Sequence, residues 1–175
     1  MNNKIDTNIL DTIIRDDIIN YRLIISDFDI NSEYDSSNML ELAISYGATN
    51  IALYLLSKNI NIHHRDKNGL TSLHVCSWYF NKYNCLEIAQ ALIDSDVEID
   101  AIDKYGNTPL WYAVHFSTLN IYKKDSFRYN LVKLLVDTGA NPLHLNNVKR
   151  TPVDLATIHN DSYLLELLSN HARNN

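Results

Sequence analysis

The chain is poor in the residues that make tight turns. Its 175 residues include four Gly and three Pro, which argues against an all-β fold with many short strands and turns. Cysteine is scarce as well, because Cys76 and Cys85 are the only two. Two cysteines cannot form a disulfide framework, so we interpret them as reduced residues of an intracellular protein.

Positive charge and long apolar segments are also scarce. The chain carries 15 Lys and Arg against 21 Asp and Glu, a net charge of −6. This balance argues against a general binder of nucleic acid or of anionic membranes. No segment approaches the roughly 18 to 20 apolar residues of a membrane span, and residues 1–6 lack the apolar stretch of a signal peptide. We therefore expect a cytoplasmic protein with neither nucleic acid nor membrane as its partner.

What the chain does contain is an internal repeat. Residues 71–76 read Thr-Ser-Leu-His-Val-Cys, residues 108–113 read Thr-Pro-Leu-Trp-Tyr-Ala, and residues 151–156 read Thr-Pro-Val-Asp-Leu-Ala. A weaker copy, Asn-Met-Leu-Glu-Leu-Ala, occupies residues 38–43, and successive copies start 33, 37 and 43 residues apart. A second apolar signature at residues 55–56, 92–93 and 135–136 always precedes the next copy by 16 residues. The extra length therefore lies between the first and second signatures of the copies that start at residues 71 and 108. The stretch that leads from a second signature to the next copy has a constant length.

Each signature lies in a helical pattern, with apolar residues three or four apart. Thr108 and Thr151 fit helix caps, each followed by a proline in the first turn, where a missing N–H costs nothing. Residues 66–69 and 103–106 resemble turns just before the caps. Residues that tolerate the left-handed conformation at a helix end follow the second signature of each unit, at Asp27, Asn59, Asp96 and Gly139.

Helix, loop, helix and turn at a basic period of 33, with the motif Thr-Pro-Leu-His-x-Ala, resembles the ankyrin repeat. The resemblance implies one all-α solenoid domain over residues 1–175, with turn fingers, atypical end caps and insertions between the helices of units three and four. We place its five units at residues 4–34, 35–65, 66–102, 103–145 and 146–172. The fifth unit has Lys149 where the turn Gly is expected, so we expect a distorted turn there. The resemblance also implies that His74, the motif His, hydrogen-bonds a neighbouring turn.

No arrangement typical of a catalytic or metal site is present. The chain has no G-x-S-x-G, P-loop, dinucleotide-binding or H-E-x-x-H motif. His63 and His64 are adjacent, and adjacent side chains point to different sides of the backbone. We therefore predict no catalytic residues, no metal, no cofactor and no enzyme activity. The distant alternative is a hydrolytic or metal-dependent enzyme, with His74 and His115 as the histidines nearest the groove.

The resemblance implies a protein-binding site on the concave face formed by the turns and the first helices. The family's contact positions in the turns fall on Lys67, Asn68, Leu70, Lys104, Tyr105 and Asn107. Those on the first helices fall on Ser45, Tyr46, Trp78, Tyr79, His115 and Phe116.

These positions are rich in aromatic residues, of which the chain has 11 Tyr, four Phe and two Trp. Aromatic side chains among isolated Lys and Asn are typical of binding hot spots. The alternative is that the insertions, which are aromatic themselves, pack on each other as a small satellite core. Trp111 replaces the motif His, so we expect it to be half-buried framework. A basic cluster at Lys123, Lys124 and Arg128 is interrupted by Asp125 and does not favour nucleic-acid binding.

We therefore predict a non-catalytic module, monomeric when free, that binds another protein. Residues 106–114 and 146–156 resemble small bacterial ankyrin-repeat immunity proteins, which neutralise toxins of interbacterial competition. That resemblance implies a cognate toxin as the partner. The alternative is an ankyrin scaffold or a secreted effector that binds host proteins.

Overall fold

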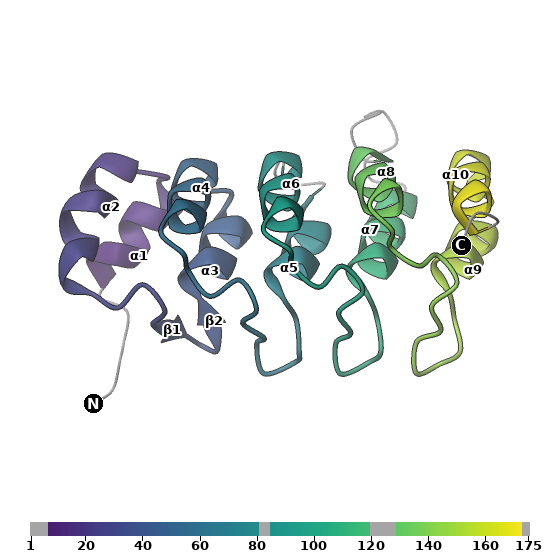
Figure 1. Cartoon of the computed structure of the whole chain (residues 1–175), viewed down its shortest axis with the longest axis horizontal. Helices are drawn as coiled ribbons and strands as arrows, with labels where there is room; N and C mark the ends of the chain where they lie inside the picture. Colours follow the sequence, from purple (N-terminus) through teal and green to yellow (C-terminus); the bar gives the residue numbers. More distant parts are fainter. Residues whose placement is uncertain (1–6, 81–84, 120–128, 173–175) are drawn as a thin grey trace.

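The structure, a computed structural model, describes residues 7–80, 85–119 and 129–172. Ten α-helices within these residues form five pairs in a row, and the turns project to one side (Figure 1). The helices are α1 (Thr7–Ile14), α2 (Ile18–Ile24), α3 (Met39–Tyr46), α4 (Thr49–Ser57), α5 (Ser72–Tyr79), α6 (Leu86–Asp94), α7 (Pro109–Thr118), α8 (Asn130–Asp137), α9 (Pro152–Ile158) and α10 (Ser162–Ala172). The predicted all-α repeat fold is confirmed. The centres of the two predicted insertions, with the cluster of Lys123, Lys124 and Arg128, lie outside the described residues.

The helices form two layers. The first helices of the pairs, α1, α3, α5, α7 and α9, each contact the next in the row, and we call them the inner helices. The second helices, α2, α4, α6, α8 and α10, form the outer layer in the same way. Buried leucines such as Leu40, Leu73 and Leu110 repeat at one position of the inner helices. The small residues Ala43, Cys76 and Ala113 follow three positions later and let neighbouring units approach closely. The core is therefore shared between units along the whole row.

The three complete turn fingers, residues 66–70, 103–107 and 146–150, have the same hydrogen bonds. The side-chain Oδ1 of Asp103 accepts the backbone N–H groups of Tyr105 and Asn107, both at 2.8 Å. Asn146 does the same for residues 148 and 150, at 3.1 and 3.0 Å. Lys149 takes the left-handed conformation, with φ of 59°, as Gly106 does at 74°. The expected distortion of the fifth turn is therefore wrong, because the side chain of Asn146 fixes the same turn and Lys149 adopts its backbone conformation.

The second unit has a hairpin in place of a finger. Strands β1 (Glu33–Tyr34) and β2 (Ser37–Asn38) pair antiparallel. Asp35 and Ser36 between them both have positive φ, 47° and 68°, which is the backbone of a tight hairpin turn. Asn38 then caps α3 together with Glu41. A different local structure thus leads into the same inner helix.

The predicted left-handed helix ends are present at Asn59, Asp96 and Gly139, where φ is 57°, 64° and 102°. The first unit ends differently: α2 continues into the short 3-10 helix η1 (Ile25–Asp27). The predicted left-handed helix end at Asp27 is therefore wrong, because Asp27 lies within this right-handed turn.

The first turn of α5 departs from those of α7 and α9. Pro109 and Pro152 occupy the first helical positions of α7 and α9, as predicted. Ser72 has the same place in α5, and its hydroxyl is buried with no hydrogen-bond partner among the described residues. The preceding Thr71 is extended, with φ of −101° and ψ of 168°, a conformation that a following proline requires.

We predict that Ser72→Pro raises the free energy of unfolding by about 0.5–1 kcal/mol, because it removes a buried unpaired hydroxyl and restricts the unfolded chain. Urea unfolding monitored by circular dichroism measures this. Pro109→Ser is the reverse change in the next unit and should lower stability by a similar amount. A loss of stability in Ser72→Pro would contradict the prediction.

His74 links the third unit to the next finger. The backbone N–H of Thr71 donates to His74 Nδ1 at 3.1 Å, so Nδ1 is the acceptor and Nε2 carries the proton. Nε2 then donates to the carbonyl oxygen of Asn107 at 3.1 Å, which confirms the bond to a neighbouring turn. The ring is fully buried, and this burial lowers the pKa of His74 below its usual value of about 6.5. The neutral ring therefore belongs to the folded state.

This linkage has a pH dependence of defined sign. Below about pH 6.5 the unfolded chain takes up a proton at His74 before the folded chain does, so stability is lost as the pH falls. We predict that His74→Gln loses less stability than the parent between about pH 7.5 and 5.5, although it is less stable at both ends. Urea unfolding at several pH values tests this. Equal losses in the two proteins would show that His74 titrates normally when folded.

Candidate protein-binding surface

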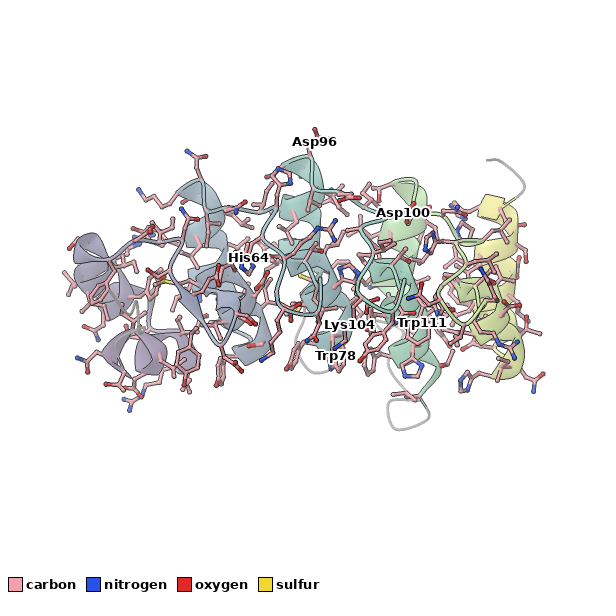
Figure 2. All side chains as sticks on the ribbon, turned by 90° about the horizontal axis from the view of Figure 1, so that it is seen from below. His64, Trp78, Asp96, Asp100, Lys104 and Trp111 are labelled. Atoms are coloured by element: carbon pink, nitrogen blue, oxygen red, sulfur yellow. The ribbon has the colours of Figure 1, made fainter. Side chains whose placement is uncertain are left out.

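Inner helices α5 and α7 bring five rings together on one side of the array. The ring of Trp78 on α5 lies 5.2 Å from that of Tyr112 and 5.3 Å from that of Phe116, both on α7. Trp111 stacks on His115 at 5.1 Å, and His115 lies against Phe116 at the same distance. We call these five residues the aromatic face. In Figure 2, Trp78 and Trp111 lie along one long edge of the molecule, whereas Asp96 lies at the opposite edge.

The aromatic face is packed and partly exposed at the same time. Trp78 keeps 44% of its surface exposed although it contacts two rings. His115 and Phe116 are half-buried. The contacts resemble those of a satellite core, yet they leave ring surface open to solvent. Packing between α5 and α7 and contact with a partner are therefore compatible.

Tyr112 is a central member of this face that the sequence analysis missed. It is buried, and its hydroxyl donates to Asp103 Oδ2 at 2.7 Å. Burial, with the bond to Asp103, raises the pKa of Tyr112. Tyr112 therefore anchors the finger of the fourth unit, residues 103–107, to α7 and supports the ring of Trp78. The sequence did contain a signal for Tyr112. The corresponding residues of the two preceding copies, Leu42 and Val75, are aliphatic, so an aromatic residue at this position is a departure from the repeat.

Trp111 lies where the repeat motif has His, and the structure shows it half-buried, as expected. It makes no bond like that of His74: its Nε1 and the Nδ1 of His115 have no hydrogen-bond partner among the described residues. Burial, with the nearby His159, lowers the pKa of His115. Instead, His144, just before the finger of the fifth unit, donates from its Nε2 to the carbonyl oxygen of Gly106, 3.1 Å away. Trp111 thus contributes ring packing where His74 contributes a hydrogen bond.

A pocket of about 200 Å³ lies between α3 and α5, beside the finger of the third unit, residues 66–70. We call it the α3–α5 pocket. It brings together four of the expected contact positions, Ser45, Leu70, Trp78 and Tyr79. It also contains four residues that were not predicted as contacts, Ser37, Glu41, Asp66 and Val75.

Glu41 is a buried carboxylate at the motif-His position of the second unit, with 2% of its side chain exposed. Its Oε2 accepts the backbone N–H of Asn38 at 3.0 Å, and its Oε1 lies 2.9 Å from Nδ1 of His64. Nε2 of His64 lies 3.1 Å from a carboxylate oxygen of Glu33. Burial raises the pKa of Glu41, and His64 opposes this rise. Burial disfavours protonation of His64, but the two carboxylates raise its pKa overall.

The predicted turn contacts are partly engaged with one another. Lys67 Nζ donates to a carboxylate oxygen of Asp35 in the hairpin at 2.9 Å. Lys104 donates to the side chain of Asn68 and lies 4.9 Å from the ring centre of Tyr105. Neighbouring turns are therefore tied together by the residues expected to contact a partner. Tyr105 is 55% exposed and Tyr46, on α3, is 42% exposed, so both rings are accessible.

Asn107 is a correction to the predicted contacts. Only 6% of its surface is exposed. Its backbone carbonyl accepts from His74, and its side-chain oxygen accepts from the amide of Asn146 at 2.8 Å. Asn107 therefore holds three consecutive units together, and little of its surface is accessible to a partner.

No group of three or more His, Cys, Asp or Glu side chains among the described residues is placed to hold a metal ion. None of the helices in the same residues has the length and apolar character needed to cross a membrane.

Comparison with known proteins gives one family. The family model for ankyrin repeats (3 copies) matches residues 12–103 and again residues 82–175. Among curated proteins, the chain is similar to a putative ankyrin repeat protein of Acanthamoeba polyphaga mimivirus, with 25% identity over 82% of the chain. It is also similar to the palmitoyltransferase AKR1 of Lachancea kluyveri, with 31% identity over 73% of the chain. A transient receptor potential cation channel subfamily A member 1 homolog of Caenorhabditis elegans is 32% identical over 49% of the chain.

The chain spans a small part of each of these relatives. The matches cover 17% of the viral protein, 18% of the palmitoyltransferase and 9% of the channel homolog. The similarity therefore concerns the repeats and not the whole of those proteins.

The ring contacts lead to a stability prediction. Trp78→Ala should lower the free energy of unfolding by about 1–2 kcal/mol, because it removes contacts with two rings. Tyr105→Ala should lower it by less than about 0.5 kcal/mol, since Tyr105 lies exposed on a finger. Urea unfolding of both variants measures the difference. Equal effects would contradict the packing role assigned to Trp78.

Proposed function

Because the chain belongs to the ankyrin-repeat family, whose repeats mediate binding to other proteins, we propose that it captures a partner protein on its inner-helix side. The ankyrin fold is generally a non-catalytic binding scaffold, and the proposed module is non-catalytic as well. The aromatic face is the centre of the proposed contact, and the α3–α5 pocket and the finger residues Lys67, Lys104 and Tyr105 flank it.

The observation that carries this proposal is the exposed, supported ring of Trp78. Its position is fixed by Tyr112 and Phe116 behind it, so little conformational entropy would be lost when a partner covers the 44% that is exposed. Large aromatic side chains in such settings supply much of the binding free energy at protein interfaces. Polar and charged finger residues around them are typical of an interface rim.

A narrower hypothesis concerns the identity of the partner. The resemblance of residues 106–114 and 146–156 to bacterial immunity proteins supports a cognate toxin, and the net charge of −6 would speed association with a basic target. The names of the three relatives above refer to a viral repeat protein, a palmitoyltransferase and an ion channel. Immunity therefore rests on the sequence resemblance alone, and a scaffold or effector that binds host proteins is the alternative. Rescue of cells from a toxin encoded beside this chain would favour immunity, and absence of both binding and rescue would exclude that toxin.

The binding surface itself can be tested once a partner has been recovered from the native cell by affinity capture. We predict that Trp78→Ala weakens binding by at least about 2 kcal/mol, roughly thirtyfold in the dissociation constant. Isothermal titration calorimetry at a temperature where the variant is folded measures this. The matched control is Tyr163→Ala, which removes a 49% exposed aromatic from outer helix α10. Tyr163→Ala should bind normally, and the opposite result for the two variants would place the site on the outer helices.

A further inference from the structure

The α3–α5 pocket combines negative charge with an aromatic wall. We propose that it receives the guanidinium group of an arginine side chain from the partner protein. This inference rests on the proposed function, because it names the chemistry that the partner presents to one part of the same surface.

The charge of the pocket favours a cation. Two carboxylates, Glu41 and Asp66, are among its eight lining residues, and no Lys or Arg is. The basic side chains beside the pocket have partners of their own: Lys67 bonds to Asp35, and Arg65 bonds to Glu98 at 2.6 Å. His64 lies between the carboxylates of Glu41 and Glu33. A phosphate or a carboxylate would be repelled here, whereas a partner's cation would be attracted.

The carboxylates retain hydrogen-bonding capacity. Oδ1 of Asp66 accepts two backbone N–H groups of its own finger, but Oδ2 accepts only from the Asn68 amide, at 3.3 Å. Each oxygen of Glu41 has a single partner, Asn38 or His64. A carboxylate oxygen can accept two hydrogen bonds, so both residues can take further donors. The serines at positions 37 and 45 of the rim add two more polar groups.

The aromatic wall selects among cations. Tyr112 and Phe116 contact Trp78 from α7, whereas the pocket borders Trp78 from α3, on the other side of α5. Tyr79 also lines the pocket. A planar guanidinium can stack on an aromatic ring while its edge donates to carboxylates, and the compact ammonium of lysine cannot do both as well. This combination points to arginine.

The test uses the complete chain labelled with ¹⁵N and three small probes: N-acetyl-arginine amide, N-acetyl-lysine amide and N-acetyl-citrulline amide. Citrulline has nearly the shape of arginine without its charge. We expect the arginine probe to shift the indole N–H signal of Trp78 and the backbone signals of Leu70 and Val75, with a dissociation constant on the order of millimolar. Citrulline and lysine should bind at least about threefold more weakly.

The chain offers a matched pair of variants. Asp66→Asn removes one of the two carboxylates of the pocket and should keep the finger intact, because Asn146 makes the same two backbone bonds in the fifth unit. Asp103→Asn is the same change one unit away, at a residue that does not line the pocket. The Tyr112 hydroxyl, which donates to Asp103, can accept a hydrogen bond from the new amide instead, so the support of Trp78 is kept. We expect Asp66→Asn to weaken binding of the arginine probe about threefold or more and Asp103→Asn to leave it unchanged. Trp78→Leu, which keeps an apolar wall without a ring, should weaken binding too.

Four outcomes would overturn this inference: no shift at the pocket signals, equal binding of citrulline, equal binding of lysine, or equal loss in Asp66→Asn and Asp103→Asn. If the recovered partner still requires Trp78 while any of these is found, the proposed function stands and only the arginine assignment fails. If the arginine probe binds as expected but Trp78→Ala leaves the partner's affinity unchanged, the proposed function fails at this surface.

Discussion

The structure depends on the fact that no helix pair of this chain can bury its apolar surface alone. Leu40, Leu73 and Leu110 reach full burial because the inner helices lie in contact along the row. Each unit is therefore stable only against its neighbours. This requirement explains the constant interval of 16 residues across each joint between units, whereas the length between the two helices of a unit varies freely.

Hydrogen bonds between units fix the register in which the units stack. His74 reaches the carbonyl of Asn107, and the side chain of Asn107 accepts from Asn146. Three consecutive units are thus joined through buried polar groups that would be costly to leave unpaired. The joints hold the inner helices and fingers in a constant register, so equivalent positions of successive units lie side by side on one surface. That surface is where the aromatic face and the α3–α5 pocket lie.

The features that distinguish this protein from a regular repeat array lie where a unit departs from the repeat motif. Glu41 replaces the motif His and brings a buried carboxylate, bonded to His64, to the α3–α5 pocket. Tyr112 occupies a place that is aliphatic in the two preceding copies and supports the ring of Trp78. Lys149 departs from the motif without changing the structure, because Asn146 keeps the turn of the fifth unit regular. The motif maintains the array, and the exceptions give it a specific surface.

The sequence by itself determined the helix pairs, their caps and the left-handed ends at Asn59, Asp96 and Gly139, because apolar spacing and turn chemistry act within a few residues. It also placed Trp78 and Tyr105 on helix and finger positions that are exposed. Only the tertiary structure decided that Asn107 is buried, that Glu41 and Asp66 meet at one pocket, and that Tyr112 joins two helices. These properties arise between units, where the side chains of the neighbouring unit set burial and electrostatics. A repeat motif predicts that units stack, but it does not predict which side chains the stacking brings together.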